Sequence, residues 1–136
     1  MGEPMALNLA RSGVPLVVWN RSGEKCVPLQ AAGAAIARTS DEVFARADVV
    51  MLMLANEAAI DAVLCRGTGT FSSLVSKGTI VQMGTIPPEC SLQLATDVCD
   101  AGGVYVEAPV SGSRKPASLS LWSRETTLVS RACCRC

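Results

Sequence analysis

The sequence predicts an α/β protein built around a mostly parallel sheet, and two observations carry this prediction. Short apolar runs alternate with amphipathic stretches along the chain, which is the pattern of consecutive βαβ units. The strongest run, residues 49–54, is apolar on both faces, as in a strand that helices cover on both sides. With 136 residues, 49% of them hydrophobic and 18% charged, the chain can form one packed domain.

The elements of the first half have clear start and stop signals. The expected strands cover residues 16–19 and, weakly, 35–37; the expected helices cover 4–13, 23–32 and 39–47. Pro4 suits the first turn of a helix, where a missing N–H costs nothing, and Gly13 and Gly33 end the first two helices. Thr39 and Glu42 have the spacing of a capping box, which predicts the third helix.

The second half continues the alternation. The expected strands cover residues 49–54, 79–83 and 104–106; the expected helices cover 57–64, 71–76 and 87–102. Asn56 can cap the first of these helices, and the Pro87-Pro88 pair opens the last.

In parallel sheets ligands bind beyond the carboxyl ends of the strands. The segments expected there are 20–22, 55–56, 84–85 and 108–113.

Composition excludes several classes of function. Twelve basic and twelve acidic side chains cancel, and no dense basic patch predicts a nucleic-acid partner. The longest apolar run, residues 49–55, is too short to span a bilayer, and no secretory signal opens the chain, so we expect a cytoplasmic protein without a membrane partner. The chain has no histidine, and its seven cysteines do not match a common zinc spacing, so we expect reduced thiols and no metal.

Arg21 is the most informative single residue. It lies in the Asn20-Arg21-Ser22 turn directly after the strand at 16–19, and the first carboxylate after that strand is Glu24. In a dinucleotide-binding fold the second strand ends beside the adenosine ribose, where an acidic residue selects NAD and an arginine pairs with the 2′-phosphate of NADP. Taken alone, the tripeptide is more simply an ordinary polar turn, so other motifs must decide.

Three segments in the right order supply that context. These segments are the opening M-G-x-P-M-A-x-N-L, the turn at 20–22 and E-A-P-V-S-G-S-R-K-P-A at 107–117. Together they resemble the β-hydroxyacid dehydrogenase family, which includes 3-hydroxyisobutyrate dehydrogenase. The S-G-S-R-K-P-A ending is most similar to the glyoxylate/succinic semialdehyde reductase branch. The resemblance runs from Met1 to Ala117 and implies a Rossmann-type doubly wound parallel sheet.

The resemblance also implies a cofactor and a set of site residues. NADP, or NADPH, would be the cofactor. The residues implied to bind it are Met1, Gly2, Asn20, Arg21, Ser22, Met53, Leu54, Ala55 and Thr85. The residues implied to hold the carboxylate of a small substrate are Ser111, Gly112 and Ser113. Gly2 would be the last glycine of the family's G-x-G-x-M-G fingerprint, at a helix start that approaches the pyrophosphate.

Two family features are not in this sequence. The first strand and the first two glycines of the fingerprint would precede Met1, so the sheet is expected to lack its first strand and the chain to be marginally stable. The family's general acid is a lysine in a G-x-x-G-x-x-x-K-x-x-N-like segment, a context that Lys25, Lys77 and Lys115 do not have. We expect residues 1–117 to form an incomplete NADP-binding domain and residues 118–136 to be a divergent tail outside it.

The sequence thus favours one function and leaves others open. The favoured one is the NADP-binding domain of an NADPH-dependent reductase of small aldehyde- or keto-acids, such as glyoxylate or succinic semialdehyde, inactive alone. The alternatives are a non-catalytic NADP-binding or oligomerisation module and a nonfunctional truncated product. Whether the chain forms a homo-oligomer is not decided by the sequence.

Overall fold

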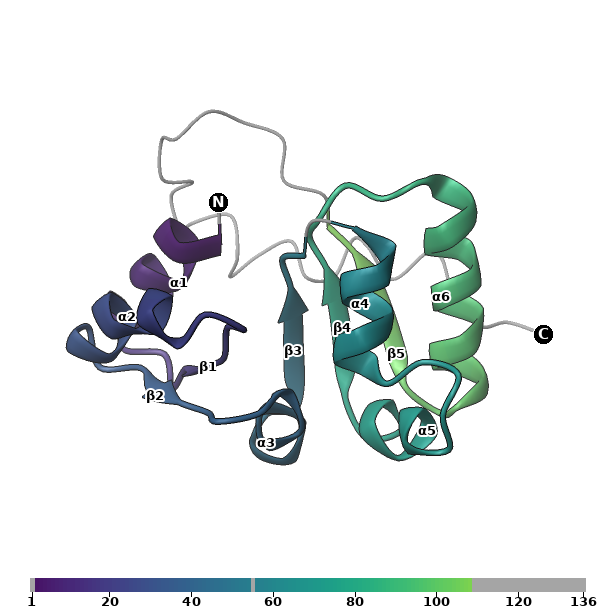
Figure 1. The fold of residues 1–136 in the computed structure, drawn as a ribbon, viewed down its shortest axis with the longest axis horizontal. Helices are drawn as coiled ribbons and strands as arrows, with labels where there is room; N and C mark the ends of the chain where they lie inside the picture. Colours follow the sequence, from purple (N-terminus) through teal and green to yellow (C-terminus); the bar gives the residue numbers. More distant parts are fainter. Residues whose placement is uncertain (1, 55, 109–136) are drawn as a thin grey trace.

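A computed structural model describes residues 2–54 and 56–108, and within these ranges the chain alternates strands and helices as predicted (Figure 1). The strands are β1 (Val17–Val18), β2 (Ala35–Ile36), β3 (Val49–Leu52), β4 (Thr79–Gln82) and β5 (Val104–Glu107). The helices are α1 (Gly2–Arg11), the 3-10 helix η1 (Gly23–Cys26), α2 (Val27–Ala31), α3 (Ser40–Arg46), α4 (Glu57–Leu64), α5 (Thr70–Val75) and α6 (Pro88–Asp100). The α/β class is confirmed.

All the strand pairs are parallel, but the described strands form two sheets. β1 pairs with β2, and β3, β4 and β5 form a second sheet in that order. In the 3-2-1-4-5-6 strand order of a doubly wound fold, one further strand separates the counterparts of β1 and β3. Within the described ranges no strand lies there, and β1 and β3 each keep one unpaired edge.

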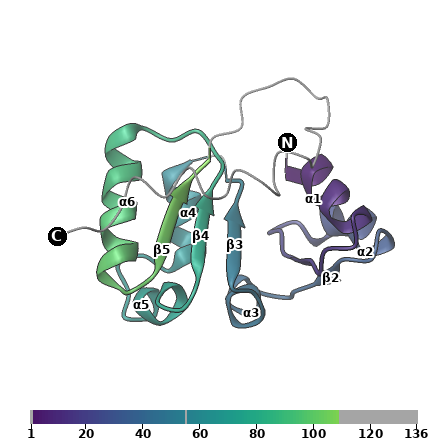
Figure 2. The same ribbon diagram turned by 180° about the vertical axis from the view of Figure 1, so that it is seen from behind.

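The main core lies between the three-stranded sheet and the helices α4, α5 and α6, which cover one of its faces (Figures 1 and 2). Ile80 of β4 is fully buried there, against Leu64 of α4 and Val98 of α6, which are fully buried as well. Each such aliphatic side chain stabilises the fold by about 1.5–3 kcal/mol through its removal from water. This core holds β3, β4 and β5 in register, so their carboxyl ends meet at one edge.

The helix starts confirm the predicted caps. Thr39 precedes α3 and its Oγ1 accepts the N–H of Glu42 at 3.3 Å, while a Glu42 carboxylate oxygen accepts the N–H of Arg38 at 2.9 Å. Asn56 precedes α4, and its Oδ1 accepts the N–H of Ala59 at 2.9 Å. The Thr39 and Asn56 side chains thus satisfy N–H groups that the first turn of a helix leaves without a backbone acceptor, whereas the Arg38 N–H lies just before α3.

The predicted helix at 23–32 is divided in the structure. Residues Gly23–Cys26 form η1, and α2 begins at Val27. Pro28 lies in the first turn of α2 and has no N–H to donate to a residue one turn earlier, so an α-helix cannot run through it undisturbed. The first four strands are shorter than predicted, with β1 limited to Val17–Val18 and β3 ending at Leu52, whereas β5 extends one residue further than predicted, to Glu107.

Candidate cofactor-binding site

The first part of the candidate site is the start of α1. A Cβ placed on Gly2 would lie 3.3 Å from Cγ of Met53, so the N-terminus of this ten-residue helix is packed against the segment that follows β3. The first N–H groups of a helix have no intrahelical acceptor and carry partial positive charge, which favours an anion. The structure therefore brings together two residues, Gly2 and Met53, that the sequence assigned to the cofactor from distant positions.

The second part lies where β3 and β4 end. A Cβ on Gly84 would lie 2.5 Å from the carbonyl oxygen of Leu54 and 3.2 Å from Nε2 of Gln82, a separation that no side chain other than hydrogen allows. Because Gly84 has no side chain, the segment after β4 can lie close to the segment after β3. Thr85, which follows Gly84, is exposed where β4 ends. Hydroxyl and backbone groups placed there can contact a ligand lying along the carboxyl ends of the strands.

The third part is the turn after β1. The Oδ1 atom of Asn20 accepts the N–H of Ser22 at 3.0 Å, which closes a tight turn with Arg21 at its tip. Arg21 is exposed, and its guanidinium makes no hydrogen bond or ion pair with any residue in the described ranges. An unpaired guanidinium offers two parallel N–H donors to a phosphate.

Five of the predicted site residues cannot be placed. Met1, Ala55, Ser111, Gly112 and Ser113 lie outside the described residues, as does the whole segment 109–136. The strand that leads to the predicted substrate segment is described, and its last residue, Glu107, accepts a hydrogen bond from Ser91 of α6 at 2.9 Å. This contact ties the exit of β5 to the start of α6.

Sequence reasoning missed two basic residues near the Asn20–Ser22 turn. The N–H of Lys25 donates to the carbonyl oxygen of Ser22 at 3.1 Å, which places Lys25 in the next turn of the chain. Arg38 follows β2, the strand that pairs with β1. Both residues are exposed. Arg38 could have been found from the rule that neighbouring parallel strands end at one edge, but only if the weak strand at 35–37 had been paired with the strand at 16–19.

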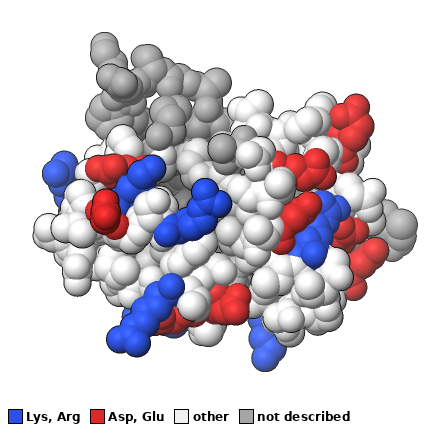
Figure 3. Space-filling view, in the orientation of Figure 1, with Lys and Arg blue, Asp and Glu red and all other residues white. Residues whose placement is uncertain are grey.

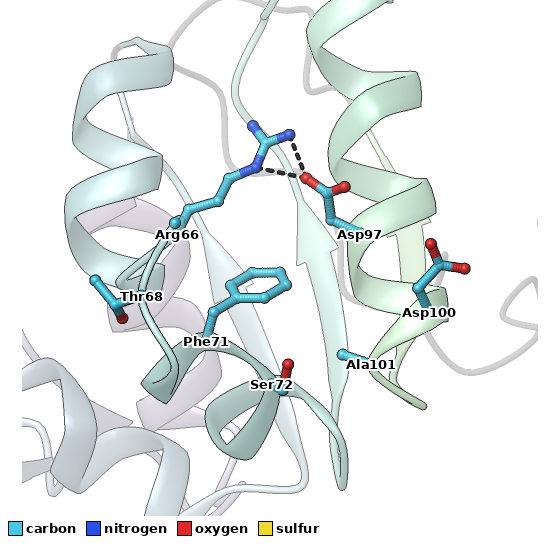
Figure 4. Close-up of a pocket in the computed structure, with 8 residues that line it drawn as sticks. Arg66, Thr68, Phe71, Ser72, Asp97, Asp100 and Ala101 are labelled. Carbon is cyan, nitrogen blue, oxygen red and sulfur yellow. Dashed lines mark hydrogen bonds and ion pairs between the residues drawn. The ribbon is translucent and has the colours of Figure 1, made fainter.

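A pocket elsewhere in the fold has a structural explanation. It lies at the amino ends of β4 and β5, away from the strand exits, and Figure 4 shows Arg66 reaching over Phe71 toward Asp97. Its lining residues are Arg66, Gly67, Thr68, Phe71, Ser72, Asp97, Asp100 and Ala101. Nε of Arg66 donates to Asp97 at 2.7 Å, and Nη1 donates to Asp61 at 3.2 Å. Desolvation lowers the pKa of the guanidinium, but these carboxylates outweigh it and leave that pKa above its ordinary value.

The charge of Arg66 is therefore already neutralised by residues of α4 and α6. We assign Arg66 to joining these two helices rather than to binding a ligand.

On the face seen in Figure 3, basic and acidic side chains are interspersed, without a broad patch of one sign. No helix in the described part of the chain is long and apolar enough to cross a membrane. The same ranges contain no group of three or more Cys, Asp or Glu side chains arranged to hold a metal ion.

Comparison with known proteins agrees with this geometry. The family described as the NAD binding domain of 6-phosphogluconate dehydrogenase matches residues 1–121. Glyoxylate/succinic semialdehyde reductase 2, chloroplastic, of Arabidopsis thaliana is 41% identical over 118 residues, which cover 86% of this chain and 33% of that protein. Mitochondrial 3-hydroxyisobutyrate dehydrogenase of Mus musculus is 32% identical over 112 residues, covering 82% of this chain and 33% of that protein.

A solved structure has a similar fold. The imine reductase from Aspergillus terreus, in complex with NADPH4, superposes with a TM-score of 0.73 at 26% identity, covering 83% of this chain and 38% of that one. The parallel strand pairing, the family match and this structural likeness define an NAD(P)-binding domain of the Rossmann type. The chain belongs to the family of the 6-phosphogluconate dehydrogenase NAD binding domain. Within that family it belongs with the NAD(P)-binding domains of the β-hydroxyacid dehydrogenases and imine reductases. It spans between 33% and 38% of the length of these three relatives.

Proposed function

We propose that this domain binds NADP in preference to NAD and serves an NADPH-dependent reductase of small aldehyde- or keto-acids, such as glyoxylate or succinic semialdehyde. The observation that carries the cofactor preference is the exposed, unpaired Arg21 at the tip of the turn after β1. A carboxylate at this turn would bind the ribose hydroxyls of NAD and repel a 2′-phosphate, whereas a guanidinium attracts it. The Ser22 hydroxyl can add a hydrogen bond to the same phosphate.

The remaining residues are assigned along the cofactor from this end. Met1 and Gly2 are assigned to the pyrophosphate, with Gly2 at the start of α1, and Met53, Leu54 and Ala55 are assigned to the middle of the cofactor. Thr85 lies toward the nicotinamide ribose. The contacts of Gly2 with Met53 and of Gly84 with Leu54 support this order, because they put the three segments at one edge of the fold.

The substrate class is proposed from the segment after β5 and from the relatives. Ser111, Gly112 and Ser113 offer a hydroxyl and backbone amides that suit a carboxylate, and the Arabidopsis relative named above is a glyoxylate/succinic semialdehyde reductase. Bound NADPH supplies the hydride for reduction of the substrate carbonyl. The resulting alkoxide needs a proton donor, and no lysine of this chain has the sequence context of the family's general acid. We therefore expect the chain to bind the cofactor without turning over substrate.

Two measurements on the 136-residue chain test this proposal. Fluorescence titration with NADPH is expected to show saturable binding, tighter than the binding of NADH by about tenfold or more. NADPH oxidation with glyoxylate or succinic semialdehyde is expected to stay at the rate without protein. A folded chain that binds neither nucleotide, or binds both equally, would contradict the proposed cofactor, and turnover would contradict the need for a further proton donor.

A further inference from the structure

A second arginine, Arg38, follows the strand that pairs with β1. In the two-stranded sheet, Val18 of β1 is in register with Ile36 of β2, and the N–H of Ala37 donates to the carbonyl oxygen of Val18 at 2.9 Å, so the ladder continues past the end of β2. Neighbouring strands are about 4.8 Å apart. Arg38, the next residue, therefore lies at the carboxyl end of this sheet, the same end as the turn that carries Arg21.

The backbone of Arg38 is fixed by the start of α3. Its N–H donates to Oε2 of Glu42 at 2.9 Å, in the capping arrangement that also includes Thr39. Because this hydrogen bond holds the peptide N–H, the first atoms of the Arg38 side chain start from a defined position. A side chain that begins from a fixed point loses less freedom when it binds a ligand.

The guanidinium of Arg38 forms no hydrogen bond or ion pair in the described ranges, although the backbone N–H of Arg38 and, more weakly, its side-chain charge lower the pKa of Glu42. The carboxylate on the facing turn of α3, Glu42, already accepts the Arg38 N–H through Oε2 and the Arg46 guanidinium through Oε1, at 3.1 Å. The Arg38 side chain makes no hydrogen bond or ion pair with another described residue, and Arg38 is exposed. Two guanidinium groups without a hydrogen bond or ion pair, those of Arg21 and Arg38, thus follow the carboxyl ends of β1 and β2.

We propose that Arg38 is a second specificity-determining residue, which contacts the 2′-phosphate of NADP together with Arg21. A phosphate monoester carries nearly two negative charges near pH 7 and has three outer oxygens, so one bidentate arginine leaves acceptor capacity for another. This inference rests on the proposed NADP preference and adds a residue from a different strand. It gives Arg38 no role toward the 5′-phosphate or the adenine ring.

The test uses two mononucleotide probes that differ only in the 2′-phosphate: adenosine 2′,5′-bisphosphate and 5′-AMP. Calorimetric titration of the Arg38→Gln chain is expected to show about tenfold weaker binding of the bisphosphate and an unchanged affinity for 5′-AMP. Arg38→Lys, which keeps the charge but not the planar fork, is expected to recover part of the loss. Arg46→Gln, the same change of charge one helix turn beyond Glu42, is the matched control and should leave both affinities within about twofold.

The outcomes separate this inference from the proposed function. Equal loss of both probes in Arg38→Gln would overturn the inference, because it would place Arg38 on the adenine ring or show a general disturbance of the fold. If Arg38→Gln leaves the affinity for the bisphosphate unchanged while Arg21→Ala abolishes it, the role of Arg38 alone is overturned. If the unmodified chain binds both probes equally, the proposed NADP preference fails, and the role of Arg38 fails with it.

Discussion

Replacing Arg21 by Asp should remove the preference of this domain for NADPH over NADH. The substitution deletes a charge-assisted hydrogen-bond pair, worth about 1.5–3 kcal/mol, and places a carboxylate against the 2′-phosphate. Since each 1.4 kcal/mol is a tenfold change in affinity, we expect NADPH binding to weaken by about two orders of magnitude. The NADH affinity should stay level or rise, because a carboxylate at this turn can accept the ribose hydroxyls. Fluorescence titration with both nucleotides measures the ratio.

Lys77→Asp is the control for the change of charge. Lys77 is an exposed residue in the turn between α5 and β4, at the opposite edge of the sheet, and forms no ion pair within the described ranges. Its replacement changes the net charge by the same amount, so any loss of NADPH affinity that it shares with Arg21→Asp is due to long-range electrostatics. Discrimination that persists at the original level in Arg21→Asp would remove Arg21 from the phosphate site.

Gly84→Ala should both destabilise the fold and weaken cofactor binding. The new methyl group would be 2.5 Å from the carbonyl oxygen of Leu54, a backbone atom that cannot move without shifting the exit of β3. Forcing an extra methyl group into packed surroundings costs typically about 1–3 kcal/mol. Because the shift moves the exit of β3, both NADPH and NADH should bind more weakly, and their ratio should change little. Urea denaturation and nucleotide titration of the same preparation measure the two effects.

The matched control is Gly69→Ala. Gly69 precedes α5 with a φ of −63°, and a Cβ there would have no atom within 4 Å, so alanine fits without strain. This variant should match the original chain in the free energy of unfolding to within about 0.5 kcal/mol. If Gly84→Ala proved as stable as Gly69→Ala, the close approach of the β3 and β4 exits would be wrong.

Local sequence signals predicted most of the fold. The spacing of Thr39 and Glu42 gave the start of α3, and Asn56 gave the start of α4, because caps depend on atoms only a few residues apart. Gly13 and Gly33 end their helices with φ of 81° and 99°, conformations that glycine adopts without strain. The break before α2 was missed because Pro28 was treated as part of one continuous helix.

The assembly of the site was less predictable, since it depends on pairs of segments far apart in the chain. The sequence indicated Arg21 by its place after a strand, and Gly2 and Thr85 by resemblance to a family, and it gave no distance between them. It gave no reason for Gly84 to be glycine, because that reason is a carbonyl oxygen 30 residues earlier in the chain. It also left Arg38 unnoticed, because only the register of β2 against β1 brings Arg38 to the edge that carries Arg21.

The most direct test of the NADP assignment is a crystal structure of the chain grown with NADPH. It should show the 2′-phosphate within hydrogen-bonding distance of the Arg21 guanidinium and the pyrophosphate at the start of α1, beside Gly2. A cofactor bound with its 2′-phosphate away from the turn after β1, or bound at the pocket of Arg66, would contradict the assignment.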